Sequence, residues 1–164
     1  MNSGMSTIGA LPEAAGRALE AWRTLRGAAG AAPALADLAP AEIPRQLLPW
    51  LMTIRRLPDR QLVYGVVGEQ MVEGHGENPR GKPFLYDAPR DVAKTRIELV
   101  HAALDRTAPF WVASRGVRAR QWAHFGRLGL PTLAADGEAL LVLFFRLAAA
   151  DAPKEKIERV VWLD

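Results

Sequence analysis

Apolar side chains recur every three or four residues in two long segments of the chain, and this period predicts two helices. The first segment spans 12–27, and its apolar side is formed by Ala15, Ala18, Leu19, Trp22 and Leu25. Pro12 suits a first helical position, because its missing N–H would have no partner inside the helix. The second helix begins after Asp91, a candidate N-cap, and ends at Pro109.

Runs rich in β-branched and aromatic residues predict five strands. Residues 51–56 and 61–68 form a hairpin ahead of the long helix, and a third strand starts at Pro109. Asp136-Gly137 lies between two apolar runs and is the strongest short hairpin signal in the chain, so we expect a positive φ at Gly137. The second arm, LLVLFF, is apolar on both faces. It predicts a central strand with three core residues, Leu141, Leu143 and Phe145.

The order of these elements predicts an α+β fold with a five-stranded, mostly antiparallel sheet, helices packed on one face and an extra N-terminal helix. A chain of 164 residues is long enough for one domain with a hydrophobic core. The expected parts are a disordered N-terminus (1–11), an N-terminal helix and connector (12–49), a core (50–147) and a C-terminal extension (148–164). The tail 151–164 fits a capped helix and a short strand equally well.

Composition narrows the chemistry. The absence of cysteine excludes disulfides, a thiol nucleophile, cysteine-ligated metal sites and a cysteine-linked flavin. The chain does not start with a basic stretch followed by an apolar run, and no apolar segment reaches the roughly 20 residues that span a bilayer. We therefore expect a cytoplasmic protein without a membrane partner. The net charge is +3 and the arginines are scattered, so nucleic acid is not an expected partner.

The segment EGHGENPRGKPF, residues 73–84, has the glycine and lysine spacing of a phosphate-binding P-loop. The residue after Lys82 is Pro83, which has no hydroxyl for Mg²⁺, and Pro79 removes one backbone N–H from the loop. The following residues cannot open a helix, so no helix dipole faces the loop. We therefore interpret the glycines as turn formers and do not expect nucleotide binding.

Four segments in order resemble the stand-alone bacterial PAS-type family: LPEAAGRALEAWRTLRG, PALADLAPAEIPRQLLPWL, LVYGVVGEQMVEGHGENPRGKPF and LPTLAADGEALLVL. They match its tryptophan-containing helix, its DxxPxxIPxxLPxL-like segment, its strand ending in VG, its GxxxxGK/R loop and its LP…DG hairpin. The resemblance covers residues 12–147. It implies a PAS fold in which Gly81 ends the irregular segment after the first hairpin. It also implies a sensory or protein-interaction module that acts through a partner chain.

A PAS-like sheet can line a small apolar pocket with a few polar groups. The candidate ligand-binding residues are the aromatic and imidazole side chains on the expected strands and long helix: Tyr64, His101, Trp111, Trp122, His124 and Phe145. A packed core is the competing interpretation, since alternation does not decide which strand residues face inward. Some haem-binding PAS domains ligate iron from the long helix, where His101 lies, but a histidine bonded to the backbone is the commoner case. We do not expect haem.

An enzyme is the alternative function. No serine lies in a nucleophile elbow, and the three histidines lack metal-ligand spacing, so neither a catalytic nor a metal site is expected. A small cone-shaped α+β isomerase or dehydratase would need an Asp–His pair. His101 and Asp105, four residues apart on the long helix, are the candidates. We favour the module over the enzyme.

The first helix is the expected homodimer interface, with Trp22 as its anchor beside Leu19 and Leu25. Small residues at 15 and 18 would let a second backbone approach closely. The competing interpretation is that this apolar side packs on the chain's own sheet. A homodimer would leave the outer face of the sheet for a signalling partner.

Overall fold

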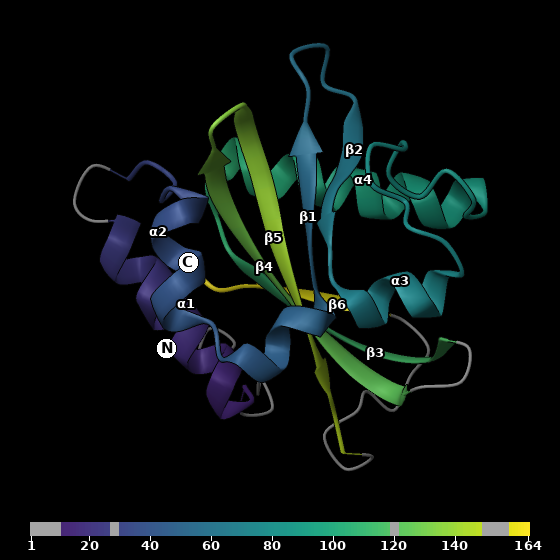
Figure 1. Ribbon diagram of the computed structural model, residues 1–164, viewed down its shortest axis with the longest axis horizontal. Helices are drawn as coiled ribbons and strands as arrows, with labels where there is room; N and C mark the ends of the chain where they lie inside the picture. The colour runs from purple at the N-terminus through teal and green to yellow at the C-terminus, as the bar shows by residue number, and fades with distance from the viewer. Residues whose placement is uncertain (1–10, 27–29, 119–121, 149–157) are drawn as a thin grey trace, which may run out of the picture.

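One open sheet of six strands organises the chain, and helices cover both of its faces (Figure 1). The computed structural model describes residues 11–26, 30–118, 122–148 and 158–164, and within them it leaves out the side chains of 39–42, 115–118, 122 and 123. The strand order is β2-β1-β5-β4-β3-β6, and every paired strand is antiparallel to its neighbour.

The elements follow one another closely along the chain. The strands are β1 (Leu51–Arg56), β2 (Leu62–Val67), β3 (Phe110–Arg118), β4 (Trp122–Ala134), β5 (Gly137–Arg146) and β6 (Arg159–Trp162). The helices are α1 (Glu13–Arg26), α2 (Leu35–Glu42), α3 (Glu69–His75) and α4 (Arg90–Arg106), with a 3-10 turn, η1 (Arg45–Trp50), before β1. The predicted α+β class and antiparallel sheet are therefore confirmed.

The predicted hairpin at Asp136-Gly137 is confirmed. Gly137 has a φ of +132° and pairs with Ala134 across the β4–β5 turn. The three core residues expected in the second arm, Leu141, Leu143 and Phe145, are buried. Strand β5 lies between β1 and β4, as its two-sided apolar pattern predicts.

Over the described residues the sheet has six strands rather than the five expected. Residues Arg159–Trp162, in the tail that fitted helix or strand equally well, form β6 and pair with β3. Trp162 lies opposite Phe110, and the two rings meet edge to face with centroids 6.0 Å apart. The sheet thus extends past the expected core boundary at 147. The expected disorder of 1–11 falls almost wholly outside the described residues.

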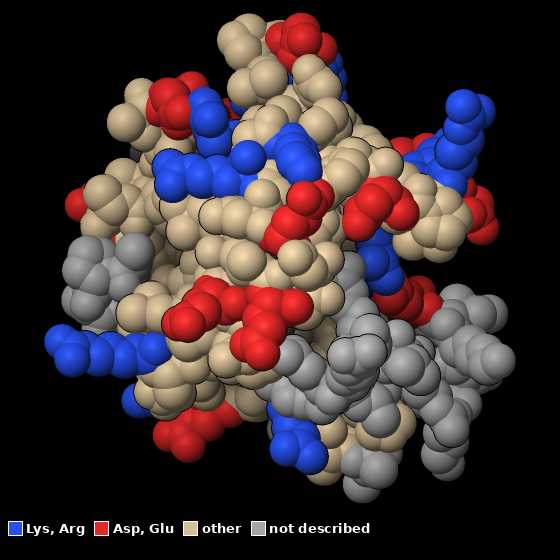
Figure 2. Space-filling view, turned by 45° about the vertical axis from the view of Figure 1, so that its right-hand side comes forward, with Lys and Arg blue, Asp and Glu red and all other residues tan. Residues whose placement is uncertain are grey.

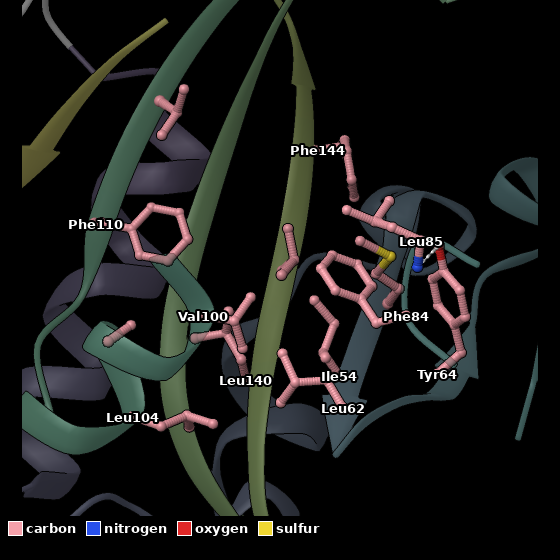
Figure 3. Packing of buried hydrophobic residues seen from close by; sticks show 14 of the residues in the cluster. Ile54, Leu62, Tyr64, Phe84, Leu85, Val100, Leu104, Phe110, Leu140 and Phe144 are labelled. Carbon is pink, nitrogen blue, oxygen red and sulfur yellow. Dashed lines mark hydrogen bonds between the residues drawn. The ribbon is translucent and has the colours of Figure 1, made fainter. Parts of the chain in front are cut away.

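The face of the sheet that α4 covers carries one hydrophobic cluster, and we call it the α4 face. Its strand residues are Met52, Ile54, Leu62, Tyr64, Phe110, Val112, Phe125, Leu140, Val142 and Phe144. Val100, Ala103 and Leu104 pack on them from α4, and Phe84 and Leu85 pack on them from the segment before α4 (Figure 3).

The opposite face, which we call the α1 face, carries a second cluster under α1 and α2 (Figure 1). Ala15, Ala18 and Trp22 have no exposed surface, and the indole Nε1–H of Trp22 donates a buried hydrogen bond of 2.7 Å to the carbonyl of Pro131. Helices therefore lie on both faces of the sheet, which corrects the one-face expectation.

The position of α1 also corrects the expected dimer interface. Trp22 and Leu19 are buried against the chain's own sheet, and only Leu25, at 41% exposure, is open to solvent. The small residues at 15 and 18 let α1 approach its own strands instead of a second copy.

We predict that Trp22→Glu unfolds or severely destabilises the chain, by about 3 kcal/mol or more, because it removes a buried indole and leaves an unpaired charge. Leu25→Glu, on the exposed side of the same helix, should change the free energy of unfolding by less than about 0.5 kcal/mol. Urea denaturation followed by circular dichroism measures both. A stable Trp22→Glu variant with an altered oligomeric mass would return α1 to the role of dimer interface.

Gly137 and Gly16 form a second matched pair. Gly137→Ala should destabilise the fold by about 1 kcal/mol, because a φ of +132° is strained for any residue with a Cβ. Gly16→Ala should stabilise it by up to about 1 kcal/mol, since Gly16 lies inside α1 with open space around its missing Cβ. Thermal melts of the two variants should therefore shift in opposite directions, and equal shifts would contradict the turn geometry.

Candidate functional site

A cavity of about 360 Å³ lies between the α4 face, α3 and the segment that joins α3 to α4. Its apolar walls are formed by Trp50, Met52, Val67, Met71, Pro79, Phe84, Leu85, Ala88, Phe125 and Phe144. Its polar lining comes from Tyr64, Gln70, His75, Asp87, Arg96 and Arg127. Ligand sites for small molecules have this volume and this mixture of apolar walls with few polar groups.

The irregular segment after α3 is held against the outer edge of β2, and this creates one wall of the cavity. Gly81 N–H donates to the Tyr64 carbonyl at 2.8 Å, Tyr64 N–H donates to the Lys82 carbonyl at 3.0 Å, and Phe84 N–H donates to the Leu62 carbonyl at 2.9 Å. The Tyr64 hydroxyl then accepts a hydrogen bond of 3.3 Å from the Leu85 N–H (Figure 3). These bonds place Phe84 and Leu85 over the sheet.

Polar groups of the glycine loop, residues 73–84, form hydrogen bonds with other groups of the same chain. Gly76 ends α3 in the left-handed region, and the Lys82 N–H donates to the Pro79 carbonyl at 2.9 Å. The Lys82 ammonium bonds Glu77 at 2.6 Å and lies over the Tyr86 ring. Hydrogen bonds from Lys82 and Tyr86 lower the pKa of the Glu77 carboxyl below its usual value. This use of Lys82 and the loop N–H groups supports the prediction that no phosphate is cradled here.

Of the six side chains predicted to bind a ligand, Tyr64 lines the cavity. Trp111 and Phe145 lie on the α1 face, where their rings pack with centroids 5.9 Å apart. A Cβ at Gly126 would run into the Trp111 ring, so a glycine at this position of β4 lets the indole lie flat across the strand. These two aromatic residues are core residues of the opposite face, which corrects the prediction.

The two candidates on β4 do not join the cavity either. His124 directly precedes the cavity residue Phe125, so its side chain leaves the strand on the opposite face. Its Nδ1 is buried and has no hydrogen-bond partner among the described residues. The side chain of Trp122 lies outside the described residues.

His101 and Asp105 belong to an ion-pair network at the β1–β2 hairpin, away from the cavity lining. The buried guanidinium of Arg56 bonds Glu138 at 2.7 and 2.9 Å, Asp105 at 2.7 Å and the His101 Nδ1 at 3.3 Å. Arg60 adds a second bond to Asp105 at 3.1 Å. Burial and the two arginine charges lower the pKa of His101, and hydrogen bonds from Arg60 and Arg56 lower that of Asp105.

This network does not supply the Asp–His pair of the enzyme alternative. In such a pair the carboxylate orients the imidazole, whereas here Asp105 accepts hydrogen bonds from two arginines and His101 contacts the same two guanidinium groups. Within the described residues, the arrangement ties α4 to the first hairpin and to the start of β5.

A second ionic cluster lies where the cavity meets the C-terminal strand. The Glu158 carboxylate accepts hydrogen bonds from Arg127 at 2.7 Å, from Arg96 at 3.1 Å and from the Ser114 hydroxyl at 2.9 Å. Partial burial alone would raise the pKa of Glu158, but the charges of Arg127 and Arg96 and the bond from Ser114 outweigh it. The pKa therefore lies below its usual value.

Sequence reasoning missed most of the cavity lining, including Phe125, Phe144 and both arginines. One signal was available: Arg127 is a single charged residue inside the apolar strand β4, two positions after Phe125 and therefore on the same face. A charged side chain at such a position needs a buried partner or a polar site.

The surface around this side of the molecule carries mixed charges. Lysine and arginine side chains lie among aspartate and glutamate side chains over the visible described residues, and neither sign covers a large part of this view (Figure 2). Over the described ranges, no three His, Cys, Asp or Glu side chains gather as metal ligands. None of the helices there has both the length and the apolar character needed to cross a membrane.

Comparisons with protein-family models, with curated proteins and with solved structures returned no match to this chain.

We predict that the Glu158 cluster makes stability depend on pH. Because the pKa of Glu158 is lower in the folded protein than in the unfolded chain, its ionised carboxylate stabilises the fold above about pH 4.5. This stabilisation is lost as the pH falls through the folded-state pKa. At pH 7, Glu158→Gln should cost about 1 kcal/mol, at the low end for charged hydrogen bonds because a third of the side chain is exposed.

The difference in free energy of unfolding between wild type and Glu158→Gln should shrink as the pH is lowered from 7 to 3. Glu73→Gln, an exposed residue of α3, makes the same charge change and should stay within about 0.5 kcal/mol of wild type. Urea denaturation across this pH range tests the cluster. A difference that is constant with pH would contradict it.

Proposed function

We propose that the chain is a PAS-like sensory or interaction module that binds a small, largely apolar molecule between its sheet and helices and acts through a partner chain. The cavity beneath Phe84 and Leu85 carries this proposal. A cavity of about 360 Å³ with six polar side chains among apolar walls has the volume and the lining of a small-molecule site.

The arrangement of elements supports the PAS-like part of the proposal. An N-terminal helix with Trp22 precedes a hairpin, an irregular segment that runs through Gly81, a long helix and a second hairpin, in the order that the sequence resemblance implies. Strand β6 is an addition at the free edge of β3 and leaves the order of the other five strands intact.

The enzyme alternative has less support. His101 and Asp105 lie outside the cavity lining and are bonded to arginines. His75 and Asp87 do line the cavity, with 3.5 Å between the His75 Nε2 and a carboxylate oxygen, but the Asp87 side chain is about half exposed. The buried Asp–His pair that such an enzyme needs is therefore not formed among the described residues.

Output through a second copy or a signalling partner belongs to the same proposal. The contact would have to avoid Trp22 and Leu19, which are buried in the chain's own core. Exposed apolar side chains on the described surface include Leu48, Val66 and Leu133, at 45–50% exposure. If the module signals through a partner, the partner must bind a surface whose conformation differs between the free and the ligand-bound states.

We predict that Val67→Phe blocks the cavity and that Val66→Phe does not. Val67 lines the cavity, whereas its neighbour Val66 is 50% exposed, so the same substitution adds its volume inside the cavity in one variant and outside it in the other. Native mass spectrometry of the purified proteins should show any retained small molecule in wild type and Val66→Phe, and not in Val67→Phe.

The same variants can be titrated with octanamide, a neutral probe with an apolar chain. Calorimetry should give saturable binding to wild type and Val66→Phe, weakened at least about tenfold in Val67→Phe, with circular dichroism as the check on folding. Equal binding by the two variants would contradict the proposal, as would a wild type with neither octanamide binding nor a retained molecule.

A further inference from the structure

Two arginines stand at one end of the cavity and hold a carboxylate that belongs to the chain itself. Arg96 comes from α4 and Arg127 from β4, and both line the main cavity and a smaller adjoining one of about 30 Å³. Their side chains are only 21% and 11% exposed. Both bind Glu158, which immediately precedes β6.

We propose that this end of the cavity is a carboxylate-binding site, that Glu158 occupies it in the absence of ligand, and that the ligand is a small monocarboxylate with an apolar body which competes with Glu158 for Arg96 and Arg127. The inference rests on the proposed ligand-binding function and names the class of its ligand.

The chemistry of the two arginines carries the inference. Guanidinium groups in an otherwise apolar wall are costly to bury unless they are paired and hydrogen-bonded. Planar guanidinium groups match the geometry of a carboxylate, and Glu158 already uses both of its oxygens on them. Arg96 and Arg127 are therefore positioned to bind a carboxylate, and both also line the cavity.

The apolar body of the ligand follows from the other walls. Two residues before Arg127 on the same face of β4 lies Phe125, and its ring packs 6.3 Å from that of Phe144. Met52 and Phe84 continue this apolar lining next to both cavities. A hydrocarbon chain or ring would bury its surface against these side chains while its carboxylate reaches the arginines.

Glu158 is exchangeable because its side chain is more exposed than those of its two arginine partners. A third of the Glu158 side chain is exposed, and Glu158 lies just before β6, a strand of four residues that pairs, among the described residues, with β3 alone. The far end of that strand has separate anchors, since the Leu163 N–H bonds the Pro109 carbonyl at 2.9 Å and Asp164 bonds Arg26 at 2.8 Å. Loss of the Glu158 contacts would therefore loosen the start of β6 and leave its end in place.

Octanoate and octanamide test the inference as a matched pair of probes, with the same chain and with or without the charge at pH 7. Wild type should bind octanoate more tightly than octanamide. Glu158→Gln should tighten octanoate binding by about tenfold, because a tethered competitor acts at an effective concentration on the order of millimolar. It should leave octanamide unchanged. Glu73→Gln controls for net charge and should change neither affinity.

Arg96→Gln should remove most of the preference for octanoate, since it deletes one of the two cations. Equal affinities of wild type for the two probes would overturn the inference, as would a Glu158→Gln variant whose octanoate affinity matches that of wild type. A preference that survives Arg96→Gln in full would place the carboxylate elsewhere in the cavity and overturn it as well.

Hydrogen exchange of the wild-type protein keeps the test valid if a variant fails to fold. Octanoate should speed exchange of the amides at the start of β6, and octanamide should not; unchanged or slowed exchange with octanoate overturns the inference. Suppose that Val67→Phe blocks octanamide binding but that wild type binds octanoate no more tightly than octanamide. This result overturns the carboxylate site and leaves the proposed ligand-binding module intact. If neither probe binds wild type, the inference fails. Native mass spectrometry for a retained molecule then tests the ligand-binding module separately.

Discussion

Strand β5 has to be buried on both of its faces, and the rest of the fold is arranged to satisfy that need. Its side chains from Ala139 to Phe145 are all apolar and all at most 5% exposed. Each large one that leaves water contributes about 1.5–3 kcal/mol, but only if a second layer covers it. Helix α4 and the segment 81–85 cover one face, and α1 with α2 covers the other. A sheet with helices on one face alone would leave Leu141, Leu143 and Phe145 in water.

The two faces are covered to different degrees, and the cavity results from this difference. On the α1 face, small residues let the helix come close, and the Trp22 indole both fills space and satisfies the Pro131 carbonyl. On the α4 face, α4 contacts β4 and β5, while the neighbouring part is roofed by α3 and an irregular segment. That segment is fixed by backbone bonds to the edge of β2, and its Phe84 and Leu85 side chains form one wall of the cavity.

Much of the fold could be predicted from local patterns, because each helix and hairpin carries its own signal. Helices α1 and α4 could be predicted from their apolar period alone. The Asp136-Gly137 turn and the apolar run of β5 likewise sufficed to predict the last hairpin. The tail was different: a strand of four residues next to a polar stretch has too short a pattern, and it becomes a strand because β3 offers a free edge. The number of strands and the second helical layer therefore depended on tertiary contacts.

Most of the cavity residues on the strands were not predicted, because a shift of one residue in register exchanges the two faces of a strand. In β5 both Phe144 and Phe145 are aromatic, so the sequence offers no way to choose between them. The structure resolves the choice through pairing: Tyr64 lies opposite Ile54, and Ile54 lies opposite Leu140, which puts Leu140, Val142 and Phe144 on one face. Of the predicted ligand residues, Tyr64 was on that face, while Trp111 and Phe145 were one register step away from it.

The arginines that line the cavity also hold Glu158 at the start of the last strand, so the proposed ligand binding would be linked to the sheet's edge. Any coupling of this kind is reciprocal: if a carboxylate ligand weakens the hold on Glu158, then an interaction that stabilises β6 must weaken the ligand by the same free energy. A partner that pairs with β6 or packs on it would thus sense the occupancy of the cavity without touching it. Strand β6 is well suited to this, since it lies at the free edge of the sheet with Val160 40% exposed. The output surface of the proposed module is therefore best sought at this edge rather than on α1, whose apolar side is buried in the chain's own core.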